Sequence, residues 1–175
     1  MAKKGKYVYE WPRPMAAADV AVFRFFAGKA KWRKPSWRLL LINRKNEPYK
    51  GRWALPGGFV DIDEELEDAA ARELAEETGL ASVLLEQIYT AGKVGRDPRG
   101  RVITVVFMGI TSRPRRKIKA GDDAAKARWF NLENLPKNLA FDHNEVVMLA
   151  IEKLKKRKIY QLNTKQQRNK TIKDR

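Results

Sequence analysis

The sequence of 175 residues contains no cysteine and only one histidine, His143. Without cysteine, neither a disulfide framework nor a thiolate metal site can form, which is compatible with a reducing compartment. No apolar run approaches the ~20 residues that a membrane helix needs. The basic start MAKKGKYVYEWP also lacks the apolar segment of a signal peptide. These absences predict a cytoplasmic protein with no membrane partner.

Positive charge, in contrast, is plentiful and unevenly distributed. The formal net charge is +16, and residues 151–175 contribute a net +8. Residues 27–38 add five basic residues and no acidic one, whereas residues 58–80 carry nine acidic residues against one arginine. A positive field attracts polyanions such as a diphosphate substrate or nucleic acid. Solubilising tails and loops are the simpler explanation, so a nucleic-acid partner bound through the basic tail is possible but not favoured.

The acidic stretch, residues 58–80, reads GFVDIDEELEDAAARELAEETGL and predicts a helix over 64–78. Three glutamates fall within an arc of about 100° on one side of such a helix: Glu73, Glu76 and Glu77. The apolar stripe overlaps that arc and contains Leu66, Ala70 and Leu74. Like charges at this spacing destabilise a helix, and carboxylates that face the protein lose hydration. We therefore expect a hard divalent cation there, Mg2+ or Mn2+, because such ions suit carboxylate oxygens.

The residues around this triplet favour a turn followed by a helix. The segment Leu55–Gly58 is a strand end that breaks into a turn, where glycine lets the backbone approach a ligand closely. Asp61 or Asp63 is the expected N-cap, and Gly79 is expected to end the helix in a left-handed conformation. The other acidic residues of the helix are interpreted as solvated: Glu65, Glu67 and Asp68.

This stretch resembles the Nudix box, the signature of hydrolases that act on a nucleoside diphosphate linked to another moiety. The family pattern is matched without departure by Gly58, Glu64, Arg72, Glu73, Leu74, Glu76, Glu77, Gly79 and Leu80. The resemblance implies a Nudix fold, in which a mixed β-sheet is sandwiched between α-helices. It also implies a metal-dependent pyrophosphohydrolase.

The same resemblance implies roles for individual residues of the box. The implied metal ligands are Glu73, Glu76 and Glu77, with a backbone carbonyl near Gly57 or Gly58 adding one more. Glu64 would bind the metal directly or through water, and Arg72 would orient the acids by pairing with them.

Outside the box, the order of elements is strands, helix, strands, helix. Segments suited to strands lie at 16–26, 37–43, 53–55, 102–110 and 127–130. Residues 84–94 indicate a strand pair or a strand and a bend, residues 102–110 a buried central strand, and residues 144–158 an amphipathic helix. We expect one α/β (α+β) domain over residues 1–158 and a basic, flexible tail over 159–175.

Three further segments resemble a bacterial ADP-ribose pyrophosphatase branch of the family. They are YEWPRP at 9–14, RDPRGR at 96–101 and AFDH at 140–143. This resemblance implies that ADP-ribose and water give AMP and ribose 5-phosphate, and that the protein is a homodimer. Arg96, Arg99 or Arg101 could then hold phosphates by forked hydrogen bonds, although a solvated loop is an equally good interpretation.

The aromatic and histidine side chains of these segments allow two interpretations each. Tyr9, Trp11 and Phe141 could stack on adenine, but core packing is the commoner fate of aromatic residues. His143 invites a catalytic role, yet Asp142 as N-cap with Glu145 three residues later forms a capping arrangement, which we favour. The general base stays open between Glu77 and an acid in the 121–123 loop.

Other functions compete with ADP-ribose hydrolysis. Within enzymes, the alternatives are a nucleoside triphosphate pyrophosphohydrolase and an RNA 5′-end pyrophosphohydrolase, the latter encouraged by the basic segments. A non-catalytic Nudix protein that binds a nucleotide or nucleic acid is the alternative of a different class. We favour an enzyme because the box retains every acid, and because about 25 residues after Ala150 are too few for an added winged helix.

Overall fold

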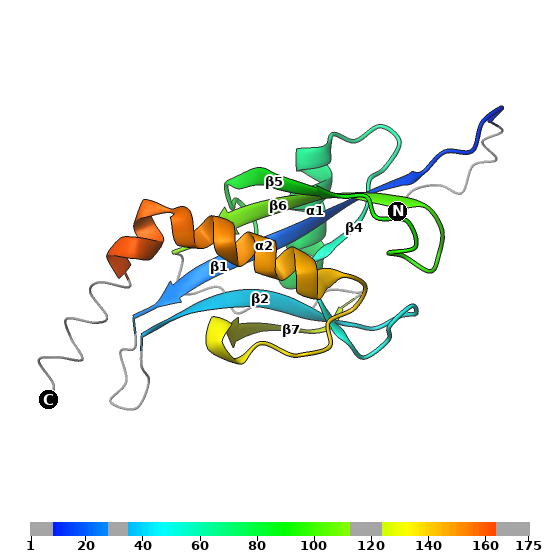
Figure 1. Cartoon of the computed structure of the whole chain (residues 1–175). Helices are drawn as coiled ribbons and strands as arrows, with labels where there is room; N and C mark the ends of the chain where they lie inside the picture. Colours follow the sequence, from blue (N-terminus) through cyan, green and yellow to red (C-terminus); the bar gives the residue numbers. More distant parts are fainter. Residues whose placement is uncertain (1–8, 28–34, 113–123, 164–175) are drawn as a thin grey trace, which may run out of the picture.

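The strand β1 (Met15–Phe26) lies at the centre of the sheet. The computed structural model describes residues 9–27, 35–112 and 124–163 (Figure 1). Within them, β1 pairs in parallel with β6 (Val102–Ile110) and antiparallel with β2 (Ser36–Arg44) and β4 (Gly57–Phe59). Residues 17–23 of β1 are buried without interruption, as expected for a strand that is covered on both faces.

The sheet is mixed, and its main path runs β3-β2-β1-β6-β5. β3 (Trp53–Ala54) and β7 (Ala124–Asn131) both pair with β2, and β5 (Leu85–Ala91) pairs antiparallel with β6. The strands predicted at 16–26, 37–43 and 102–110 are confirmed to within one residue. Residues 84–94 hold one strand followed by a turn, and a short 3-10 helix, η1 (Leu132–Asn134), follows β7.

Two helices cover opposite faces of this sheet, α2 in front and α1 behind in Figure 1. Alternate residues of β1 point to opposite faces because a strand has a side-chain period of two. Val20 and Val22 therefore pack in the cluster with α1 (Leu66–Thr78), whereas Ala21 and Phe23 pack in the cluster with α2 (His143–Lys156). This arrangement confirms the expected mixed sheet sandwiched between helices.

The start of each helix differs from the sequence prediction. α1 begins at Leu66, and Glu65 occupies its N-cap position without a side-chain cap bond, so the prediction of Asp61 or Asp63 is wrong. The predicted end is confirmed, because Gly79 has a φ of 70° and donates its N–H to Ala75 O. At α2, Asp142 occupies the N-cap position but forms no side-chain cap bond, so the capping arrangement is wrong as well.

A separate helical segment, residues 158–163, follows α2 after a bend at Arg157. The ring of Tyr160 stacks on Trp37 of β2, with centroids 5.5 Å apart, so the first residues of the predicted tail pack on the sheet. Most of the basic segment 27–38, the acids of the 121–123 loop and residues 164–175 lie outside the described residues. In the described part of the chain, no helix combines the length and the apolar character needed to cross a membrane.

Candidate active site

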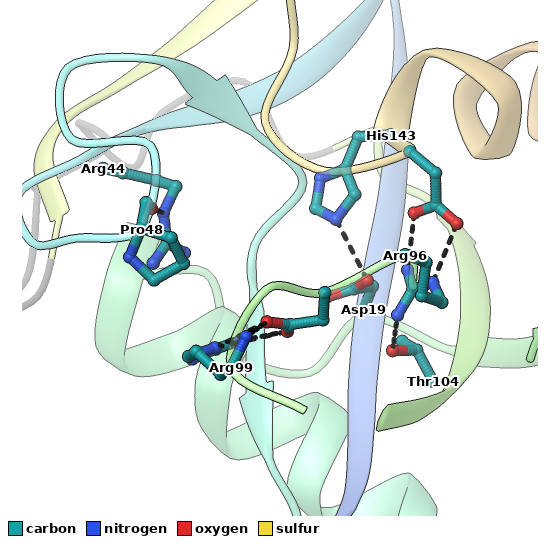
Figure 2. A network of polar contacts seen from close by, with 9 residues as sticks. Asp19, Arg44, Pro48, Arg96, Arg99, Thr104 and His143 are labelled. Carbon is teal, nitrogen blue, oxygen red and sulfur yellow. Dashed lines mark hydrogen bonds and ion pairs between the residues drawn. The ribbon is translucent and has the colours of Figure 1, made fainter. Parts of the chain in front are cut away.

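A cleft opens where β1 and β4 meet the loop between β5 and β6 and the first turn of α2. It encloses about 440 Å³ of space not filled by protein, part of it open to solvent. One wall is formed by Asp19 and the Gly57–Phe59 strand, and the other carries Arg44, Arg99 and Phe141. Figure 2 shows residues brought to this region from four parts of the fold: Asp19 from β1, Arg44 from β2, Arg96 and Arg99 from the loop between β5 and β6, and His143 from α2.

The acidic side of the cleft is organised by the turn that precedes α1. Gly57 N donates to Glu77 Oε2 at 2.9 Å, which ties the last turn of α1 to β4. Glu77 is only 7% exposed. Burial raises the pKa of its carboxyl to about 8; the Gly57 hydrogen bond opposes this shift, and the charges of Glu73 and Asp19 add to it. Glu77 therefore lies where a cation would be strongly favoured.

Arg72 holds two of the other box acids by a network of forked hydrogen bonds. Its guanidinium donates to both oxygens of Glu64, at 2.7 and 2.9 Å, and to Glu73 Oε1 at 2.7 Å. A further bond reaches Phe59 O at 3.2 Å, so Arg72 also holds the strand after the turn. The hydrogen bond from Arg72 lowers the pKa of Glu64. One arginine thus orients both glutamates and favours the ionised form of Glu64.

The donor set of this region suits a hard divalent cation. Gly58 has no side chain where a Cβ would come within 3.0 Å of the Glu73 carboxylate, so this carboxylate lies against the backbone of the turn. Glu76, with 61% of its side chain exposed, places Oε2 3.5 Å from a guanidinium nitrogen of Arg72. Among the described residues, no three Asp, Glu or His side chains converge as they stand on a point where they could hold an ion. The carboxylates fit the chemistry, and binding would draw them together.

The opposite wall of the cleft is basic and aromatic. Arg44 and Arg99 place their guanidinium carbons 4.9 and 5.4 Å from the centre of the Phe141 ring, and Arg99 also covers Phe59 at 4.6 Å. Arg99 is held by a fork to Asp97, whereas Arg44 forms no ion pair with any described residue and donates to Pro48 O. Burial and the charge of Arg99 lower the pKa of Arg44. An anion in the cleft would complement both arginines.

Only some of the residues predicted to bind the substrate line the cleft. Arg96, Arg99 and Phe141 line the cleft. Arg101 donates to Gly92 O on the outside, and Tyr9 and Trp11, the latter 74% exposed, lie away from the lining. These three residues do not line this cleft, and their role in substrate binding stays a prediction.

Arg96 reaches the cleft, but its guanidinium is occupied by protein groups. It forms a fork with Asp142 at 2.6 and 2.8 Å and donates to Thr104 Oγ1 (Figure 2). Burial opposes the charged form, but Asp142 outweighs it and raises the pKa of Arg96. This pair explains why Asp142 does not cap α2, and it ties the loop that carries Arg99 to that helix.

Sequence reasoning missed Asp19 and Arg44 and misjudged His143. Asp19 stands alone in the apolar strand AAADVAVF, and a lone charge in a buried strand is the signal that could have identified it. His143 does not serve as part of a cap. It is 3% exposed, accepts from Leu55 N at 3.0 Å and places Nε2 3.2 Å from Asp19 Oδ2. Nothing in the local pattern around Arg44 distinguishes it from other arginines.

Comparison with known proteins gives consistent matches over most of the chain. A family profile described as NUDIX domain matches residues 15–150. The chain is 49% identical over 110 residues to the ADP-ribose pyrophosphatase of Methanocaldococcus jannaschii, and the match covers 63% of each chain. It is 35% identical over 158 residues to the ADPR responsive transcriptional repressor NtrR of Acinetobacter baylyi, which covers 86% of this chain and 58% of that one.

Solved structures agree with these matches. A MutT/nudix family protein from Enterococcus faecalis superposes with a TM-score of 0.74 at 32% identity, over 85% of this chain and 65% of that chain. The NUDIX domain of Shewanella oneidensis NrtR, solved with ADP ribose, gives a TM-score of 0.71 at 30% identity, over 85% and 94% of the two chains. The chain spans 63% and 58% of the length of the two curated relatives above.

Proposed function

The chain belongs to the Nudix family, and from this we propose that it is a Mg2+- or Mn2+-dependent pyrophosphohydrolase that cleaves ADP-ribose to AMP and ribose 5-phosphate. One observation carries this proposal. A single cleft joins the turn held by Glu77 to a wall formed by Arg44, Arg99 and Phe141. Similarity to an ADP-ribose pyrophosphatase and to a domain solved with ADP ribose supports the choice of substrate.

The acidic wall would provide the catalytic part of the site. We assign the cation to Glu73, Glu76, Glu77 and a backbone carbonyl of Gly57 or Gly58, with Glu64 close by. When bound, the cation supplies charge neutralisation of the diphosphate and an activated water. Arg72 keeps Glu64 and Glu73 oriented through its forked bonds. The general base stays open between Glu77 and an acid of residues 121–123.

The basic wall would bind the substrate. Arg44 and Arg99 present guanidinium groups to the cleft, and forked donors of this kind suit phosphate oxygens. Phe141 lies between them and offers a ring on which adenine could stack. Arg96 would act indirectly, because its pair with Asp142 holds the loop that carries Arg99.

Product analysis tests this function. Wild-type protein and Glu77→Gln are incubated with Mg2+ and ADP-ribose, other nucleotide sugars, nucleoside triphosphates or 5′-triphosphorylated RNA. We expect AMP from ADP-ribose with the wild type only, because the variant loses the buried carboxylate. Cleavage of a triphosphate or of RNA with ADP-ribose left intact would retain the hydrolase and overturn the substrate.

A second candidate is a protein that binds ADP-ribose without cleaving it. It is favoured by the similarity to a transcriptional repressor described as ADPR responsive, which extends over 86% of the chain. Calorimetry with ADP-ribose in the presence of Mg2+ separates the two functions. A binding isotherm without any AMP would identify the binding protein.

We also propose that the protein is a cytoplasmic homodimer. The dimer follows the ADP-ribose pyrophosphatase resemblance, and the location follows the absence of cysteine. Light scattering on a gel-filtration peak measures the mass against the 20.2 kDa of one chain. Cell fractionation tests the location.

A further inference from the structure

We propose that Asp19 is a further acidic residue of the cation site, and that His143 is the positioning residue that orients its carboxylate. The inference rests on the proposed function, because it assigns to Asp19 the same cation as Glu77. It adds one acid from β1 and one histidine from α2 to a site otherwise formed by the Nudix helix and its preceding turn.

Asp19 occupies a position that a solvated acid would not take. It lies in the central strand, 8% exposed, with Gly57 directly opposite it in the antiparallel pair of β1 and β4. A Cβ on Gly57 would come within 3.0 Å of Asp19 Oδ1, so this oxygen lies against the glycine backbone. Within the described residues, Oδ1 accepts no hydrogen bond, and Asp19 lines the cleft. One carboxylate oxygen is thus free to bind a ligand there.

The partner of the other oxygen is a histidine whose tautomer is determined by the backbone. Leu55 N donates to His143 Nδ1 at 3.0 Å, so Nδ1 carries no hydrogen. The imidazole is therefore neutral with its hydrogen on Nε2, which lies 3.2 Å from Asp19 Oδ2. Figure 2 shows this contact between α2 and β1. His143 holds Oδ2 and thereby directs Oδ1 toward Gly57.

Two carboxylates consequently meet at one glycine. Glu77 accepts the N–H of Gly57, and Asp19 lies against the other side of the same residue. Buried like charges are unfavourable unless positive groups compensate them. Arg44 acts on both acids with a single charge, and a neutral imidazole adds none. A divalent cation that takes oxygen ligands supplies further positive charge. The backbone of Gly57, already assigned to the cation, lies between the two acids.

Mn2+ affinity of the protein without substrate tests the role of Asp19. Binding is measured by electron paramagnetic resonance for the wild type, Asp19→Asn and Glu77→Gln. We expect Asp19→Asn to weaken Mn2+ binding by about tenfold to a hundredfold, the usual range for a lost ligand partner. If Glu77→Gln weakens binding and Asp19→Asn does not, the inference is wrong and the proposed function stands. If neither variant changes affinity, the cation site itself is wrong.

Two isosteric variants separate the two bonds of His143. In His143→Gln the terminal amide nitrogen can still donate to Asp19, whereas in His143→Asn the side-chain oxygen can still accept from Leu55 N–H. If His143 positions Asp19, the Gln variant should stay within about threefold of wild-type Mn2+ affinity and the Asn variant should lose about tenfold. Equal affinities in the two variants, or the reverse order, would overturn the positioning role.

A spectroscopic measurement on the unmodified protein keeps the inference testable if a variant does not fold. His143 is the only histidine, so its imidazole nitrogens are assigned without ambiguity. We expect a neutral ring with hydrogen on Nε2, and Mn2+ added at low occupancy should broaden these signals. Melting curves in chelator identify variants whose fold is damaged. An imidazole signal that Mn2+ leaves sharp contradicts a cation next to Asp19.

Discussion

Glu77 is the most buried acidic side chain described on α1, and it accepts a backbone N–H at the edge of the cleft. Its charge has no ion pair in the described residues, so its ionisation is coupled to folding and to cation binding. The carboxylates of Glu64 and Glu73, in contrast, are paired with a cation, because each accepts a hydrogen bond from Arg72. Residues of one short motif therefore differ strongly in proton affinity.

This difference predicts how stability depends on pH in the absence of metal. The pKa of Glu77 rises from 4.5 to about 8 on folding. Between these values the unfolded state binds fewer protons, so the free energy of unfolding falls as pH rises, by up to about 1.4 kcal/mol per pH unit. Urea unfolding in EDTA from pH 5 to 8 measures this slope. Glu77→Gln should remove it, and Glu67→Gln, an exposed position on α1, should retain it.

Arg44 is expected to bind a phosphate of the substrate. It lines the cleft beside Phe141 and forms no ion pair with a described residue. A charged hydrogen bond to phosphate contributes about 1.5–3 kcal/mol, so Arg44→Gln should raise the KM for ADP-ribose roughly tenfold to a hundredfold with a smaller change in kcat. Steady-state kinetics checks this. Lys45→Gln removes the same charge one residue away, outside the lining, and an equal effect there would point to the overall field instead.

At the scale of elements, β4 is the short strand on which both walls of the cleft depend. Gly57 pairs with β1 and donates to α1, and Phe59 O receives Arg72. The two glycines of this strand differ in what surrounds them. Gly57 has a φ of 156° and is crowded by the backbone of β1, whereas Gly58 is crowded only by the carboxylate of Glu73.

Alanine at Gly57 should therefore mainly lower stability, whereas alanine at Gly58 should mainly lower activity. Gly57→Ala meets fixed backbone in a conformation that favours glycine, and we expect a loss of at least about 2 kcal/mol in unfolding free energy. Gly58→Ala displaces only the flexible end of Glu73, so stability should change by about 1 kcal/mol or less while kcat falls at least tenfold. Denaturant unfolding and ADP-ribose kinetics on both variants provide the check. A stable, fully active Gly58→Ala would show that the carboxylate of Glu73 is not needed where it lies.

Helix α2 links the two walls through consecutive residues. Asp142 binds Arg96 from the loop between β5 and β6, and His143 binds Asp19 from β1. The first turn of this helix thus determines the position of the Arg99 loop and of the acidic wall together. The pair with Arg96 explains why Asp142 occupies the N-cap position of α2 without a side-chain cap bond.

At the scale of the whole molecule, positive charge is concentrated at the C-terminal end of the chain. Residues 151–175 carry half of the net charge of +16. Within this region, Tyr160 stacks on Trp37, and Arg157 pairs with Glu86 of β5. Residues 157–160 therefore contribute to the fold.

Two truncations distinguish packing from charge. Residues 159–163 carry no charged side chain, so chains ending at Lys158 and at Asn163 lose the same charge. The shorter chain also loses Tyr160 and should be less stable by about 1–2 kcal/mol, whereas the longer one should unfold like the full chain. Both should cleave ADP-ribose within about twofold of the full chain. A sharp loss of RNA cleavage in both would instead support an RNA-directed role.

The sequence by itself determined the Nudix helix, the central strands and the chemistry of the acidic wall. These features depend on local periodicity: the glutamates share one helix face, and Gly79 ends that helix with its own backbone conformation. The strand-favouring residues at 16–26 likewise predicted a strand, and the apolar run at 102–110 predicted a buried central strand.

Only the tertiary structure decided which distant residues complete the cleft. Asp19, Arg44 and the segment that carries Phe141 and His143 come from separate parts of the chain, and their meeting depends on strand register and on where α2 docks. The tertiary structure also pairs the Asp142 carboxylate with Arg96 instead of the first turn of α2. Tyr9, Trp11 and Arg101 lie outside the lining of the cleft. The predicted side-chain cap bond of Asp142 failed because its carboxylate forms an ion pair with Arg96 across the fold, which a sequence pattern does not record.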